Sequence, residues 1–250
     1  MPLGNKIYVI GDSHIRAFSF EEQFIPLFIG PAAFNNFLTK QNADKITLKI
    51  LELFKNNLDE KFNILLLFSG DVEHVIRKSS GYSQVEIDHL NESAFRYIHC
   101  ISTLKEKLPN ATICISAVLP GRTELYSKYQ NHYISILIKY CTKKNIPFID
   151  INSLITNDKK IIRYPYKADF AHISYKVANL YLNELFEKKI LLLNEPLNVA
   201  NYKWSHVYNI ETSMGPFKIW GDVYKDQLII REHEILSLDN LQRFSIQQTE

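Results

Sequence analysis

The chain has 250 residues, which is enough for one large domain, or a domain with an appendage, around a sizeable core. Its hydrophobic fraction of 46% and charged fraction of 22% are typical of an ordinary globular protein. A net charge of +2, with both signs interspersed, gives no electrostatic reason to expect nucleic-acid binding or attachment to a membrane surface.

The hydrophobic pattern predicts strands and helices in alternation. Continuous apolar runs indicate strands buried on both faces, and apolar residues at helical spacing indicate amphipathic helices. In chain order we expect strands at 7–10 and 28–29, a helix at 43–58, a strand at 63–68, a helix at 83–108, a strand at 111–118, a helix at 124–144, a strand at 147–150 and a helix at 173–188. Such alternation predicts an α/β fold, with a parallel sheet between two helical layers and right-handed crossovers.

The pattern changes after Asn194, so we expect a main domain at 1–193 and a small β-rich extension at 194–250 packed on it. Strands are predicted at 217–224 and 227–231, joined by a turn that contains Asp226. The extension is rich in large aromatic residues: Trp204, Tyr208, Phe217, Trp220 and Tyr224. They either fill a satellite core or lend an aromatic face to the rim of a sugar-binding cleft.

Two short motifs carry groups that could act together in catalysis. Ser13 directly follows the first strand, whereas Asp169 and His172 follow the last predicted core strand. A serine is a weak nucleophile unless a histidine accepts its proton and a third group orients that histidine. Parallel sheets gather such residues beyond the carboxyl ends of their strands. The motifs therefore predict a catalytic triad, although Ser13 and Asp169 are also residue types that simply cap helices.

These motifs resemble those of the SGNH/GDSL hydrolase superfamily over about residues 5–190. The matching positions are Gly11-Asp12-Ser13, Gly30, Gly70 and Asp169-x-x-His172. The resemblance implies a flavodoxin-like three-layer α/β/α sandwich, a triad of Ser13, His172 and Asp169, and an oxyanion hole that includes the Ser13 and Gly30 N–H groups. The Gly-Asp-Ser-His form, with His14, is similar to branches linked to bacterial surface-polysaccharide modification.

The sequence departs from the family pattern in the Gly70 block. The family supplies a third oxyanion donor from an asparagine where this chain has Val72. Loss of one such donor typically costs about 100- to 1,000-fold in rate. Related sequences with Gly-Glu-Ile-Asp in this block also lack the asparagine, so the departure does not by itself imply an inactive protein. Asn35, Asn36 and His74 are the candidate replacements.

Further residues near the predicted cleft are candidates for substrate binding. They are Asp12, His14, Asn35, Asn36, Gly70, Glu73, His74, Arg77 and Arg122. Three of them have structural alternatives. Glu73 and Arg77 are spaced to form an ion pair within one helix, and Arg122 is either a bidentate ligand for an anionic sugar or phosphate or a solvated surface residue.

The expected chemistry is ester hydrolysis: removal of an O-acetyl or short acyl group from a sugar or glycan-like substrate through an acyl-Ser13 intermediate. Two alternatives stay open. One is an O-acyltransferase of surface-polysaccharide biosynthesis; the other, motivated by Val72, is a non-catalytic carbohydrate-binding protein on the same fold. Fold alone does not select among them. No cofactor is expected, and the oligomeric state is left open.

The N-terminal residues lack the apolar stretch of a signal peptide, and no segment reaches the roughly 20 apolar residues that span a bilayer. We therefore expect a cytoplasmic protein without membrane insertion. Cys100, Cys114 and Cys141 are scattered, with no pair at metal-ligand spacing, so buried reduced thiols and no metal site are expected.

Overall fold

A computed structural model of the chain describes residues 7–18, 23–29, 36–78, 81–121, 123–158, 160–163, 166, 173, 176–190, 206–212, 215–224, 227–230 and 246–248. The main sheet has five strands: β1 (Ile7–Gly11), β2 (Phe24–Phe28), β3 (Phe62–Leu67), β4 (Ala111–Ser116) and β5 (Phe148–Ile149). They lie in the order β2-β1-β3-β4-β5, and every pair is parallel. This is the flavodoxin-like order, so the predicted fold class is confirmed.

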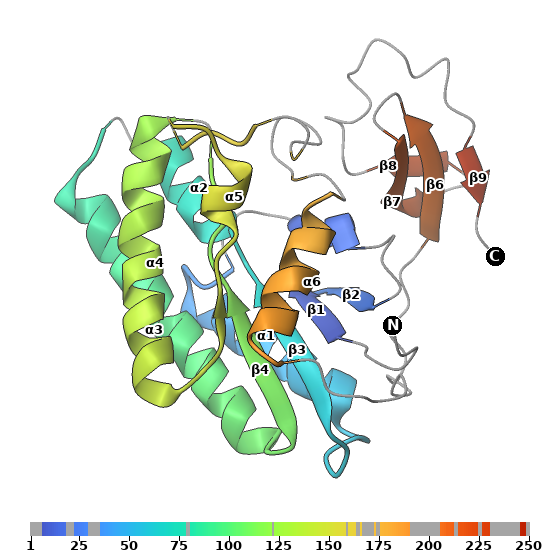
Figure 1. The fold of residues 1–250 in the computed structure, drawn as a ribbon, viewed down its shortest axis with the longest axis horizontal. Coiled ribbons are helices and arrows are strands. Elements are labelled where there is room, and N and C mark those ends of the chain that lie inside the picture. The colour runs from blue at the N-terminus through green and yellow to red at the C-terminus, as the bar shows by residue number, and fades with distance from the viewer. Residues whose placement is uncertain are drawn as a thin grey trace.

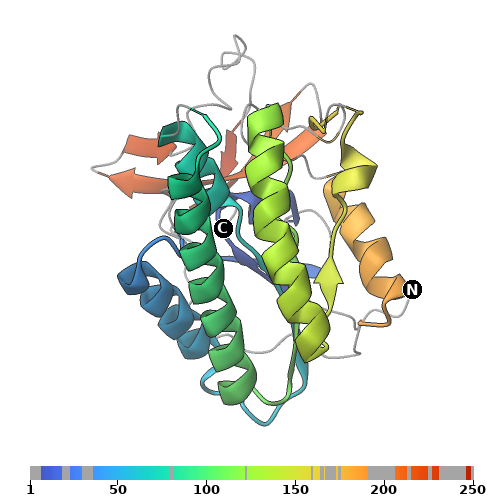
Figure 2. The ribbon, with the colours of Figure 1, turned by 90° about the vertical axis from the view of Figure 1, so that its left-hand side faces the viewer.

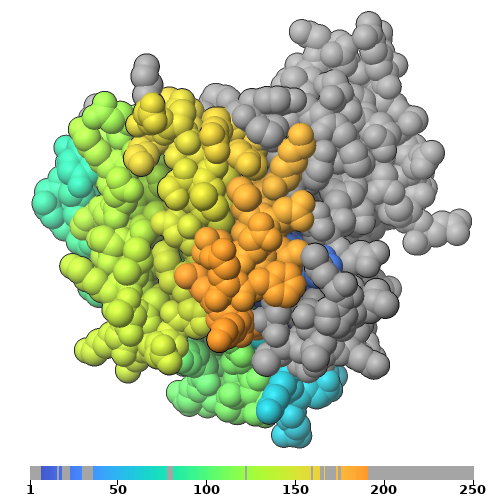
Figure 3. Space-filling model, viewed as in Figure 1, coloured from blue at the N-terminus to red at the C-terminus, as the bar shows by residue number. Residues whose placement is uncertain are grey.

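Helices cover both faces of this sheet (Figures 1 and 2). One layer contains α1 (Lys40–Phe54), α2 (Gly70–Lys78), α3 (Gln84–Lys107) and α4 (Glu124–Lys144). The other contains the 3-10 helix η1 (Ser13–Phe18), α5 (Asn152–Ile155) and α6 (Val177–Glu187). On the face shown in Figure 3, the segment around α5 lies between α4 and α6. The result is a three-layer sandwich.

The strands divide the core in two because successive side chains point to opposite faces. In β1, Tyr8 and Ile10 belong to the core beneath α1 to α4, whereas Ile7 and Val9 belong to the core beneath η1, α5 and α6. All five residues of β1 and all six of β3 are buried. The continuous apolar runs in the sequence are thus explained by strands that are covered on both sides.

Several elements of the main domain differ from the sequence-based expectations, and the short helix α5 was not predicted. Strand β2 spans Phe24–Phe28 rather than 28–29, and it contains Pro26. Because β2 lies at the edge of the sheet, the missing N–H of Pro26 is tolerated. Helix α2 was not predicted: it is short and starts at a glycine, and its apolar pattern is brief. The closing helix α6 begins at Val177 rather than 173.

Four strands near the C-terminus form a second sheet, separate from the first. It contains β6 (His206–Thr212), β7 (Gly215–Tyr224), β8 (Gln227–Ile230) and β9 (Ile246–Gln248), in the order β8-β7-β6-β9. The predicted pairing of β7 with β8 is confirmed and is antiparallel, whereas β6 and β9 were not predicted. Trp204 and the turn at Asp226 lie outside the described residues. The packing of this extension on the main domain stays a prediction.

Candidate active site

The candidate site lies beside β1, the strand at which the order of strand addition across the sheet reverses. From β1 the chain moves to β2 on one side, and β3 then returns to the other side of β1. Loops that follow such neighbouring strands diverge and leave a crevice beyond their carboxyl ends. Asp12 and Ser13 follow β1, and Ser69 and Gly70 follow β3. The topology thus brings the two predicted blocks to one edge of the sheet.

Close packing of the two strands explains the glycine at the end of β1. A Cβ added to Gly11 would lie 1.8 Å from the backbone oxygen of Leu67 and 2.9 Å from Cγ2 of Ile15. The Asp12 N–H also donates to Leu67 O across 3.3 Å. Gly11 therefore allows the Ser13 turn to lie directly against the end of β3.

The Asp12 carboxylate joins the loops after β1 and β3. Its Oδ2 accepts the Ser69 N–H at 2.7 Å and the Gly70 N–H at 3.0 Å. Its Oδ1 accepts the His14 N–H at 3.2 Å and lies 2.8 Å from His14 Nδ1. The side chain of Asn36 adds an Nδ2 donor to Oδ2 at 3.4 Å. Asp12 and His14 are each 7% exposed, so these are interior contacts and not a solvated surface cluster.

These donors decide the charge state of Asp12. Burial by itself raises its pKa, but the imidazole of His14 and the N–H groups of Ser69 and His14 together lower the pKa below its usual value. Asp12 is therefore an anion that organises backbone around Ser13. Asp12, His14 and Gly70 were predicted as substrate contacts; in the structure, Asp12 and His14 bond to each other and Gly70 contributes its backbone N–H.

Ser13 is the first residue of η1 and is half-buried. The backbone turns directly from Asp12 into this 3-10 helix, so the serine lies at the carboxyl edge of the sheet as predicted. Other predicted site residues lie outside the described residues: Gly30, Asn35, Arg122, Asp169 and His172. The triad and the oxyanion role of Gly30 therefore stay predictions.

Asn36 is the candidate replacement donor that the structure brings to Asp12. It is 1% exposed and donates through Nδ2 to Asp12, while its Oδ1 accepts no hydrogen bond among the described residues. The next residue, Phe37, donates its N–H to Asp71 Oδ2 at 2.8 Å. Sequence reasoning missed Asp71, although an aspartate directly after Gly70 at a strand end was a usable signal.

Asp71 is a second buried carboxyl group close to Asp12. Its Oδ2 also accepts the hydroxyl of Ser93 at 2.6 Å, and Ser93 Oγ lies 3.1 Å from the hydroxyl of Tyr133. Burial raises the pKa of Asp71 to about 7; the Asp12 charge adds to this shift, and the bonds from Ser93 and Phe37 oppose it. Two carboxyl groups thus share the site, one ionised and one half-protonated near neutral pH.

The remaining residues of the Gly70 block serve the fold. Val72, which stands where the family has its asparagine, is fully buried in the core and has no donor to offer. Glu73 and Arg77 form an ion pair at 3.0 Å one turn apart on α2, with the Arg77 side chain 46% exposed. This contact supports the structural alternative for the pair over a substrate-binding role.

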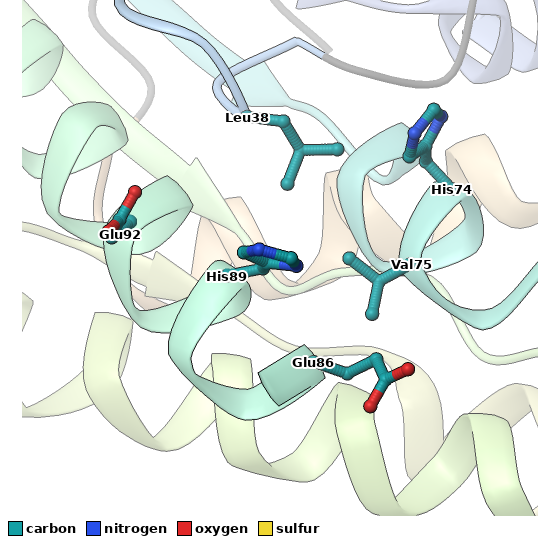
Figure 4. A pocket seen from close by; sticks show the side chains of 6 residues that line it. All are labelled: Leu38, His74, Val75, Glu86, His89 and Glu92. Atoms are coloured by element: carbon teal, nitrogen blue, oxygen red, sulfur yellow. The ribbon is translucent and has the colours of Figure 1, made fainter. Parts of the chain in front are cut away.

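His74 lines a pocket between α2 and α3 of about 280 Å³. Its lining residues are Leu38, His74, Val75, Glu86, His89 and Glu92 (Figure 4). Leu38, Val75 and His89 point toward one another across the hollow, as Figure 4 shows. The contact of Asn36 Nδ2 with Asp12 Oδ2 supports Asn36 as a group that acts near Ser13.

The described residues contain no group of three or more His, Cys, Asp or Glu side chains placed to hold a metal ion. None of their helices combines the length and apolarity needed to cross a bilayer. Cys100, Cys114 and Cys141 are all buried, as predicted, and none of them forms a disulfide.

Comparison with known structures identifies the fold. A candidate acylhydrolase from Bacteroides fragilis superposes with a TM-score of 0.51 at 12% identity, covering 74% of this chain and 88% of that one. A GDSL-like lipase from Bacteroides thetaiotaomicron superposes with a TM-score of 0.52 at 14% identity, covering 74% and 89%. No protein-family model and no curated protein sequence matches the chain. The chain therefore has the fold of GDSL-like hydrolases, as the motifs predicted.

Proposed function

We propose that the protein is a serine-dependent ester hydrolase whose nucleophile is Ser13. The observation that carries the proposal is the placement of Ser13 beside a buried, ionised Asp12 that ties the end of β1 to the end of β3. Such rigid backbone around a nucleophile is what acyl transfer requires, since the serine and its N–H must be fixed before the substrate arrives. The fold shared with a GDSL-like lipase supports the same reading.

The proposed reaction has two covalent steps. Ser13 Oγ attacks the ester carbonyl carbon while His172, oriented by Asp169, accepts the hydroxyl proton. The tetrahedral intermediate then breaks its bond to the alcohol oxygen, and His172 returns the proton to the departing alcohol. In the second step, water gives a proton to His172 and attacks acyl-Ser13. The carboxylic acid leaves, and Ser13 Oγ recovers its proton.

The oxyanion of each tetrahedral intermediate needs fixed donors. We propose the N–H groups of Ser13 and Gly30 for this role, and the Asn36 amide as the third donor in place of the missing asparagine. The position of Asn36 beside Asp12, and the burial of Val72, support this assignment. Removal of the Asn36 amide should then cost about 100-fold or more in kcat.

The proposed substrate is an O-acetyl or other short-acyl ester on a sugar or glycan. This narrower proposal draws on the Gly-Asp-Ser-His form of the motif and on the aromatic residues of the extension, such as Trp220. Transfer of the acyl group to a second sugar hydroxyl would use the same acyl-Ser13 intermediate. Val72 is the observation that favours the other candidate, a carbohydrate-binding protein without activity.

Hydrolysis of p-nitrophenyl acetate tests the proposal. We expect steady release of p-nitrophenol by the wild-type chain and loss of nearly all of it in Ser13→Ala. Ser102→Ala is the matched control, because Ser102 is an exposed serine on α3 that bonds to the Ile98 carbonyl. If wild type and Ser13→Ala are equally inactive but both bind acetylated oligosaccharides, the carbohydrate-binding alternative replaces the hydrolase. A sugar acceptor that diverts the acetyl group from water would indicate transfer.

A further inference from the structure

The segment that carries Asn36 is held in place by contacts to its backbone. The Asn36 side chain makes one hydrogen bond among the described residues, at 3.4 Å to Asp12, and its Oδ1 is buried without a partner. A single long bond does not fix an amide group. The position of the amide must therefore depend on what holds the adjoining backbone.

Asp71 holds this backbone at the peptide group that follows Asn36. Its Oδ2 accepts the N–H of Phe37, the residue next to Asn36, at 2.8 Å. Further along the segment, Arg96 Nη1 donates to the carbonyls of Phe37 and Leu38 at 3.2 and 2.6 Å. The Phe37 ring stacks on Tyr97 with centroids 4.5 Å apart. Of these anchors, Asp71 is the one that contacts the peptide group joining Asn36 to Phe37.

Asp71 is itself fixed from α3 and α4. Ser93 on α3 donates to Asp71 Oδ2 at 2.6 Å, and the Tyr133 hydroxyl from α4 lies 3.1 Å from Ser93 Oγ. Asp71 is 4% exposed and Ser93 0%. A buried polar chain that spans three helices costs free energy to desolvate, so its retention in an otherwise apolar core points to a task beyond packing.

We propose that Asp71 is a positioning residue, which aims the Asn36 amide at Asp12 and the Ser13 turn by holding the Phe37 N–H. The inference rests on the proposed function, because only a reaction at Ser13 gives the amide something to act on. Ser93 and Tyr133 contribute to this positioning because their hydrogen bonds keep Asp71 Oδ2 in place. Asp71 touches no reacting atom and acts through Asn36.

A double-mutant cycle with Asn36→Ala tests the proposal. Asp71→Leu keeps the branched shape of the side chain but removes the acceptor, and we expect a loss of at least 10-fold in kcat for p-nitrophenyl acetate with KM little changed. In the Asn36→Ala background, the same substitution should change kcat by less than 2-fold. Equal losses in both backgrounds would overturn the proposal, since a general structural defect does not depend on Asn36.

Asp71→Asn is the conservative rescue, because its amide oxygen still accepts from Phe37 and Ser93; kcat should stay within about 3-fold of wild type. If Asp71→Leu does not fold, the cycle is run with Ser93→Ala, which loosens Asp71 while leaving the Phe37 bond. We then expect about a 3-fold loss of kcat that disappears in Asn36→Ala. A 3-fold loss in both backgrounds would again overturn the proposal.

A second readout separates this inference from the proposed function. The side-chain amide of Asn36 carries two N–H protons whose NMR signals can be assigned by their loss in Asn36→Ala. In Ser93→Ala or Asp71→Leu these signals should move toward the values of an exposed amide, and in Asp71→Asn they should stay. Unmoved signals in all variants would contradict the positioning role even if the protein hydrolyses esters. An inactive wild type with shifted signals would instead contradict only the proposed function.

Discussion

The N–H of Ser69 donates to Asp12 Oδ2 across 2.7 Å, although the two residues are 57 positions apart in the sequence. Ser69 Oγ in turn accepts the N–H of Leu119, at 3.0 Å, from the loop after β4. Asp12 and Ser69 therefore tie together the loops that follow three neighbouring strands, β1, β3 and β4. A turn fixed in this way keeps the Ser13 backbone in one geometry without help from a substrate.

The contact between β1 and β3 predicts a strong effect of adding one methyl group at Gly11. Gly11→Ala would place its Cβ 1.8 Å from Leu67 O, so the strands must separate, and we expect a loss of roughly 3 kcal/mol in the free energy of unfolding. Gly81→Ala is the control, because no atom lies within 4 Å of an added Cβ there. Urea denaturation of both variants checks this, and equal stabilities would show that the strands are not so closely packed.

The charge of Asp12 predicts a loss of stability in acid. Its folded-state pKa is lowered below 3.8, so its contribution is present above that pH and is lost as the pH falls through the folded pKa. Asp12→Asn should cost about 2 kcal/mol at pH 7, because an NH₂ group would face backbone donors. The difference from wild type should shrink below about pH 4. Asp44→Asn, at an exposed position of α1, should change stability by less than about 0.5 kcal/mol at either pH.

Asp71 predicts the opposite pH dependence. Its folded-state pKa of about 7 lies above 3.8, so between these values the unfolded chain has released a proton that the folded chain retains. Stability therefore falls as the pH rises through this window, by at most about 1.4 kcal/mol per pH unit. The groups that face Asp71 are Asp12, whose charge raises the pKa, and the Ser93 hydroxyl and the N–H groups of Phe37 and Asn36, whose hydrogen bonds lower it.

The comparison that isolates this effect is wild type against Asp71→Asn, followed by chemical denaturation from pH 4 to pH 7. We expect the variant to gain stability relative to wild type as the pH rises, because it has no proton to lose at position 71. Parallel curves for the two proteins would mean that Asp71 is ionised throughout this pH range, and would contradict the raised pKa.

The sequence predicted those parts of the fold that depend on local pattern. Residues 64–68 are apolar at every position because β3 is covered on both faces, so the strand predicted at 63–68 differs from β3 by only one residue at each end. Strand β2 was misplaced because Pro26 is unfavourable in a strand unless that strand is an edge, and edge position is a property of the whole sheet.

In the site, too, the residues that depend on local sequence pattern were predicted and those that depend on tertiary contacts were not. Ser13 and Asp12 were identified because the Gly-Asp-Ser motif follows a buried strand. The role of Asp71 was not, because its partners Phe37 and Ser93 are 34 and 22 residues away. An aspartate at the start of a helix is ordinarily an exposed capping residue, and only tertiary packing buries this one.

The most direct test of the central claim is to locate the covalent intermediate. Wild-type protein is incubated with p-nitrophenyl acetate at mildly acidic pH, where protonation of the proposed base slows deacylation, and the quenched protein is mapped by peptide mass spectrometry. We expect one acetyl group per chain on Ser13 in wild type and Ser102→Ala, and none in Ser13→Ala. Acetylation at another residue together with unchanged p-nitrophenol release by Ser13→Ala would contradict the assignment of Ser13 as the nucleophile.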